Sequence, residues 1–153
     1  MSEKFQNKYR NGTFRAQWWD YGWNAAYFIT ICTQNRENFF GHKENGKMIL
    51  SKTGEIAAAW WNDIPNHHQF VELGKFVIMP NHIHGILIIN KPNMVGSGQS
   101  NPVGSGHALI LPGPGTKRFQ NIGKNTVSSM VLSYKSAVTK YANRLGYPNG
   151  WQK

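Results

Sequence analysis

The sequence predicts an α+β fold with an antiparallel sheet, and three observations support this class. Apolar residues alternate with a period of two in the stretches 27–33, 67–79 and 82–90. They recur with a helical period of about 3.6 residues after positions 51 and 126. The order strand, helix, strand, strand, helix matches the first five elements of a ferredoxin-like sandwich. We therefore expect two helices on one face of a ferredoxin-like antiparallel sheet, with the closing strand of that fold missing.

The first strand is expected at Tyr27 to Thr33, where aromatic and aliphatic residues fill alternate positions. Residues 35–50 contain Gly41 and Gly46 and are expected to form a loop or a short hairpin.

The first helix is expected to begin just after residue 51. Ser51 or Thr53 can cap it, and Glu55 suits the positive end of its dipole. Pro65 is expected to lie beyond its end. The predicted apolar stripe consists of Ile56, Ala59, Trp60 and Ile64.

Two further strands are joined at Pro80-Asn81, and the second carries two histidines. Apart from His82 and His84, both faces of this strand are apolar, which predicts a central strand covered on both sides. Residues two apart share a face about 7 Å apart along a strand, so the two imidazoles can converge on one divalent cation. A metal site needs at least a third ligand. We expect His67 and His68 to be solvated in a polar turn.

The last predicted helix has the most continuous apolar stripe. Asn125 or Thr126 can cap its start, and Gly146 followed by Pro148 ends it. The stripe consists of Val127, Met130, Val131, Tyr134, Ala137, Val138, Tyr141 and Leu145.

We expect residues 1–153 to form a single domain. Residues 1–24 are predicted to be a basic, aromatic N-terminal arm, and residues 91–122 a flexible Gly/Pro-rich excursion. Cys32 is the only cysteine, which excludes a disulfide framework. The chain has no apolar leader and no run of membrane-spanning length, so we expect a cytoplasmic protein without membrane contact.

The charge balance favours an anionic partner. Lys and Arg total 17 against 7 Asp and Glu, for a formal charge of +10. Aromatic residues stand beside several of these cations, as in Lys117-Arg118-Phe119 and Tyr134-Lys135. Such pairs suit base stacking and phosphate contact on single-stranded nucleic acid. A merely basic protein without a nucleic-acid partner is the alternative.

Several segments together resemble the HUH single-tyrosine transposases, and most closely their REP-associated tyrosine transposase branch. The most specific is Met79-Pro-Asn-His-Ile-His-Gly85, which follows Phe76-Val-Ile. The others are Tyr27–Thr33 with Arg36, Gly54–Trp60, Thr116–Gln120, Ser133–Ala137 and Trp151-Gln152.

The resemblance implies cleavage and rejoining of single-stranded, hairpin-forming DNA through a 5′-phosphotyrosine. It implies that His82 and His84 hold Mg²⁺ or Mn²⁺, which polarises the scissile phosphate. It also implies a homodimer. The expected DNA contacts are Arg36, Lys117, Arg118, Lys135 and Lys140.

The chain departs from the family in one respect. The family's nucleophilic tyrosine lies on a helix well beyond the Trp-Gln landmark, with a polar metal ligand four residues later. We therefore expect the catalytic helix and its tyrosine beyond Lys153, and no catalytic residue in this chain. Tyr134 and Tyr141 are poor substitutes because they lie on the apolar stripe and are followed four residues later by Val138 and Leu145.

These residues are thus expected to bind DNA and to bind metal weakly without forming a covalent intermediate. One alternative is a non-catalytic DNA-binding module that recognises repeat hairpins. Another is an RNA-binding ferredoxin-like domain in which His82 and His84 are packed core residues.

Overall fold

The computed structural model describes residues 4–5, 8–9, 19–92 and 125–153. The predicted excursion at 91–122 lies outside the described residues except for its first two positions, as do Lys117 and Arg118. Within the predicted N-terminal arm, β1 (Lys4–Phe5) and β2 (Lys8–Tyr9) form a two-stranded antiparallel sheet that belongs to a separate unit.

The main unit contains a three-stranded antiparallel sheet in the order β3-β7-β6. The strands are β3 (Ala25–Cys32), β6 (Val71–Met79) and β7 (His82–Ile89). The predicted α+β class is confirmed, and β7 is the central strand as expected. Of the loop or short hairpin expected at 35–50, the structure has the hairpin, formed by β4 (Gly41–Glu44) and β5 (Lys47–Leu50) after a short 3-10 turn, η1 (Gln34–Arg36).

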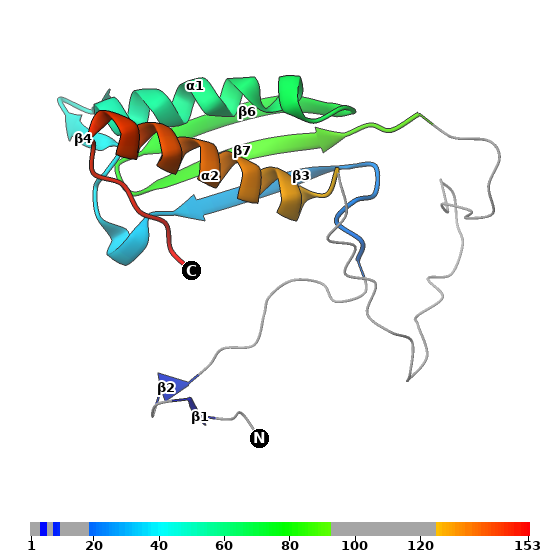
Figure 1. Ribbon diagram of the computed structural model, residues 1–153, viewed down its shortest axis with the longest axis horizontal. Helices are drawn as coiled ribbons and strands as arrows, with labels where there is room; N and C mark the ends of the chain where they lie inside the picture. The colour runs from blue at the N-terminus through cyan, green and yellow to red at the C-terminus, as the bar shows by residue number, and fades with distance from the viewer. Residues whose placement is uncertain (1–3, 6–7, 10–18, 93–124) are drawn as a thin grey trace. The chain divides into compact units, whose positions relative to one another are not determined.

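Helices α1 (Lys52–His67) and α2 (Val127–Leu145) lie side by side on one face of this sheet (Figure 1). Alternate residues of each strand face the two helices, and about every fourth residue of α2 faces the sheet. The buried apolar residues of this unit are Tyr27, Ile29, Ile31, Phe40, Ala57, Trp61, Ile64, Val71, Ile78, Ile83, Leu87, Ile89, Met130, Tyr134, Val138 and Ala142.

Capping residues fix where both helices begin. The Ser51 hydroxyl accepts a hydrogen bond from the Gly54 amide, 3.0 Å away. Thr126 and Ser129 form a reciprocal capping box at the start of α2. Gly146 ends α2 with φ 75°, a left-handed conformation that glycine adopts without strain.

Among the described residues, no helix is both long and apolar enough to cross a membrane.

Two predictions about α1 are wrong. The helix does not stop before Pro65 but runs to His67, and in its last turn Asp63 accepts hydrogen bonds from Asn66 and His67, each at 2.6 Å. His67 is therefore helical rather than part of a polar turn.

The buried stripe of α1 is also shifted from the one predicted. Ala57 and Trp61 are buried, whereas Ala59 is exposed and Trp60 is half-buried. The face of α1 that meets the sheet is thus rotated by one residue from the predicted face. Contact of Trp61 with Gly85 and Phe76 of the sheet determines this rotation.

The prediction that β7 is covered on both sides is wrong for the described residues. Both helices lie on the face of Ile83 and Leu87. On the opposite face, Phe28 is 71% exposed and Val77 is 47% exposed. This open face carries both motif histidines.

The last residues of the chain lie along the outer edge of β3. The Gln34 amide donates to the Gly150 carbonyl at 3.1 Å, and the Gln152 amide donates to the Cys32 carbonyl at 3.0 Å. Thr33 and Trp151 form an antiparallel bridge between these bonds. This is the position that the closing strand occupies in the predicted fold.

Candidate metal centre

The two motif histidines lie side by side on the open face of the sheet. His82 and His84 are half-buried, while Ile83 between them is fully buried under the helices. Their ring centroids are 4.7 Å apart and the rings are nearly perpendicular, at 74°. The prediction that they share a face is confirmed, and the pair is close enough to bind one cation.

Each imidazole is held through its Nδ1 atom. His82 Nδ1 lies 2.7 Å from Asn81 Oδ1, and His84 Nδ1 lies 2.9 Å from Thr30 Oγ1. The Asn81 amide nitrogen donates to the Arg36 carbonyl at 3.3 Å, which leaves its oxygen to accept from His82. His82 therefore carries its proton on Nδ1 and a lone pair on Nε2, and the Thr30 hydroxyl can fix the same tautomer of His84.

This arrangement matches what metal-binding histidines require. A ligating imidazole uses one nitrogen for the metal and hydrogen-bonds through the other to an orienting group. In the described part of the chain, no hydrogen bond engages Nε2 of either histidine. Two equivalent donor atoms are thus available on one face.

The electrostatic surroundings favour the neutral form of His82. Burial lowers the pKa of His82, and the neighbouring His84, Arg36 and Lys43 lower it further. Neutral imidazole is the form that binds metals. The positive charges of Arg36 and Lys43 also favour the binding of an anion close to His82 and His84.

The open face beside the histidines offers an aromatic surface. The Phe28 ring stacks on His84, with centroids 5.4 Å apart and an interplanar angle of 22°. Its other side is open to solvent. An exposed ring of this kind can stack a nucleobase.

Other predicted site residues lie in different places. Arg36 belongs to η1, and its backbone carbonyl accepts a hydrogen bond from the side chain of Asn81, the neighbour of His82. Lys135 lies on α2 near the C-terminal segment, with its ammonium 5.8 Å from the Trp151 ring and 3.3 Å from the Gln152 carbonyl. Lys140 lies further along α2, in the helical layer, so the structure does not bring all the predicted DNA contacts together.

Tyr134 and Tyr141, both on α2, do not lie beside the histidines. The Tyr134 hydroxyl is buried in the helical layer, where it donates to the Ala57 carbonyl at 2.9 Å, and burial raises its pKa strongly. Tyr141 packs on Trp60 in the same layer. The described residues contain no cluster of three His, Cys, Asp or Glu side chains suited to a metal ion.

Sequence reasoning missed Phe28, Thr30 and Asn81 as parts of this site. Asn81 stands next to His82 in the motif, so its role could have been inferred from adjacency. Phe28 and Thr30 alternate on the first strand, but only the pairing of Thr30 with His84 and of Phe28 with Ile86 shows that they border the histidines.

No family model matches the chain. It is 35% identical over 132 residues to an uncharacterized protein of Haemophilus influenzae, and the match covers 86% of this chain and 68% of that relative. A comparison of structures finds a REP-associated tyrosine transposase bound to a REP hairpin, with a TM-score of 0.49 and 13% identity. That match covers 93% of this chain, which spans 58% of the length of the solved chain.

Proposed function

The chain belongs to the same protein family as the uncharacterized Haemophilus influenzae protein, and we propose that it binds single-stranded or hairpin DNA beside a divalent metal held by His82 and His84. The observation that carries the proposal is the pair of imidazoles 4.7 Å apart on an open sheet face, each held through Nδ1. The resemblance of residues 79–85 to the HUH motif supplies the class of reaction, DNA transposition.

Each residue of the site has a distinct part in the proposal. His82 and His84 bind Mg²⁺ or Mn²⁺ through Nε2, and Asn81 and Thr30 hold the two rings in place. The bound ion would supply Lewis-acid polarisation of a phosphodiester. Phe28 stacks the base next to that phosphate, and Arg36 adds positive charge.

Strand cleavage needs a nucleophile, and Tyr27, Tyr134 and Tyr141 are poorly placed to provide one. Tyr27 and Tyr134 are buried with their hydroxyls hydrogen-bonded to carbonyls, and Tyr141 lies in the helical layer. The resemblance assigns this part to a tyrosine beyond Lys153. Residues 1–153 by themselves are therefore proposed to bind metal and DNA without becoming joined to the DNA.

Metal binding is the first test. Mn²⁺ should bind to the wild-type protein in a calorimetric titration, and the double variant His82→Ala/His84→Ala should abolish this binding. His42→Ala is the matched control, because His42 is an exposed histidine on β4. Equal Mn²⁺ affinity in the wild type and the double variant would contradict the assignment.

DNA binding is the second test, with a hairpin oligonucleotide that carries single-stranded flanks. Mn²⁺ should strengthen binding to the wild type by roughly tenfold, a gain of about 1.4 kcal/mol, and should not strengthen binding to the double histidine variant. Tyrosine-linked DNA formed by residues 1–153 would refute the proposal that the nucleophile lies elsewhere.

A non-catalytic module that binds hairpins is the second candidate. Two observations favour it. Among the described residues no third His, Cys, Asp or Glu joins His82 and His84 in a metal-binding cluster, and Phe28 is exposed on the sheet in the manner of aromatic RNA-binding platforms. In that case the double histidine variant would keep its full DNA affinity with and without Mn²⁺, whereas Phe28→Ala would weaken binding.

The homodimer implied by the resemblance is a further part of the proposal.

A further inference from the structure

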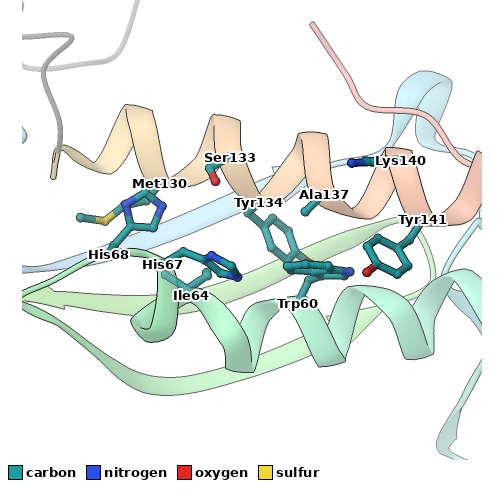
Figure 2. A pocket seen from close by; sticks show the side chains of 10 residues that line it. All are labelled: Trp60, Ile64, His67, His68, Met130, Ser133, Tyr134, Ala137, Lys140 and Tyr141. Atoms are coloured by element: carbon teal, nitrogen blue, oxygen red, sulfur yellow. The ribbon is translucent and has the colours of Figure 1, made fainter.

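A cavity of about 310 Å³ lies between α1 and α2, away from the histidine pair. Its walls come from the helical layer, whereas His82 and His84 are on the open face of the sheet. Figure 2 shows the rings of Trp60, His67 and Tyr141 between the two helices. The residues that could contact a ligand are Trp60, His67, His68, Ser133, Lys140 and Tyr141.

The aromatic part of the cavity is centred on Trp60. The Tyr141 ring lies 5.0 Å from the Trp60 ring and the His67 ring lies 5.6 Å from it, between centroids. Tyr141 is 40% exposed and Trp60 is half-buried, so these rings are accessible from solvent. A planar, aromatic ligand group is the natural partner for such a wall.

The polar part of the cavity favours an anion. Ser133 and Lys140 lie two turns apart on α2, and both are exposed. Asp63 is the nearby carboxylate in α1, but it is hydrogen-bonded to Asn66 and His67. In the parts of the main unit that the structure describes, Lys140 has no ion-pair partner, so its ammonium is available to a ligand.

We infer that this cavity binds one unpaired nucleotide of a single-stranded nucleic acid, with the base against Trp60 and Tyr141 and the phosphate at Lys140. Aromatic rings beside a cation are the usual means of holding single strands. The volume is in the range of small-ligand pockets, and the formal charge of +10 favours a polyanion over a neutral ligand. The inference extends the proposed function, because it gives the DNA strand a second contact remote from His82 and His84.

A nucleotide titration tests the cavity independently of the metal site. The indole N–H signal of Trp60, assigned by its loss in Trp60→Phe, should shift when dAMP is added without metal. Inorganic phosphate alone should not shift it, because it lacks the base. The shift should be weaker in Lys140→Gln and in Tyr141→Ala, two substitutions at exposed positions that leave the core intact. A Trp60 signal unmoved by dAMP would overturn the inference.

Hairpin binding separates this inference from the proposed function. Tyr141→Ala should weaken binding of a hairpin with single-stranded flanks by about tenfold, the usual effect of losing one base stack, and should leave a blunt hairpin unaffected. Lys140→Gln should weaken the same flanked hairpin more than Lys47→Gln, which removes an exposed lysine of β5. If both cavity variants bind like Lys47→Gln while His82→Ala/His84→Ala still loses Mn²⁺ dependence, the cavity assignment is wrong and the proposed function stands. If instead both cavity variants weaken binding of the flanked hairpin and His82→Ala/His84→Ala keeps its Mn²⁺ dependence, the metal site alone is refuted.

Discussion

Replacing Gly85 by alanine tests how the central strand and α1 fit together. A Cβ atom at position 85 would overlap Cζ2 of Trp61 and would lie 2.6 Å from Cη2 and 2.8 Å from Cε2. Trp61 is only 1% exposed, and it is confined by Phe76 at 5.8 Å and Tyr134 at 5.4 Å between ring centroids. The indole therefore has no room to move away from the new methyl group.

The size of the effect follows from this confinement. Overpacked core substitutions cost about 1–3 kcal/mol, and a rigid, fully buried indole places Gly85→Ala at the upper end, near 3 kcal/mol. For a chain of this length, each kcal/mol lowers the melting temperature by about 2–4 °C, so we expect a decrease of roughly 6–12 °C.

Thermal and urea unfolding of single and double variants provide the assay. Trp61→Phe removes the ring atoms that the new Cβ would overlap, and it loses no hydrogen bond seen in the structure, because Trp61 Nε1 has no partner among the described residues. The double variant should therefore be more stable than the sum of the two single effects predicts, by about 1 kcal/mol or more.

A control substitution separates steric overlap from a general intolerance of alanine. A Cβ at Gly46 would meet no atom within 4 Å, so Gly46→Ala carries only the backbone cost of φ +75°, about 1–2 kcal/mol. Strictly additive effects of Gly85→Ala and Trp61→Phe would refute the packing argument.

Two further predictions concern the helical layer. Tyr134→Phe should lower the free energy of unfolding by about 1 kcal/mol, because the hydroxyl donates to the Ala57 carbonyl, and it should leave DNA binding unchanged; a specific loss of DNA binding in a folded Tyr134→Phe protein would contradict this. Hydrogen bonds from Asn66 and His67 lower the pKa of Asp63, so its stabilising effect is present at neutral pH and is lost as the pH falls below about 4. Thermal unfolding across this range should show a steeper acid loss of stability in the wild type than in Asp63→Asn, and parallel curves would argue against it.

The sequence alone determined the order of the elements and the face shared by His82 and His84. Alternation along a strand is a property of the backbone, so an His-x-His pair shares a face in any regular strand. The ends of α2 were predictable for the same kind of reason, because Thr126 and Gly146 act through bonds and dihedral angles within one turn of the helix.

Tertiary structure decided which tryptophan of α1 enters the core. Trp60 and Trp61 are adjacent and both fit a helical apolar stripe, so periodicity could not choose between them. Trp61 is buried because Gly85, which has no side chain, leaves space for an indole against the sheet.

Strand pairing adds Thr30 and Phe28 to the two histidines of the candidate metal centre. Thr30 and Phe28 lie more than fifty positions before His84 in the chain, yet the register of β3 on β7 places both beside that ring. The same holds for the cavity between Trp60 and Tyr141, which depends on how α1 and α2 pack. Local periodicity follows from backbone geometry, whereas contacts between distant segments depend on the whole core and are not encoded in any one stretch of sequence.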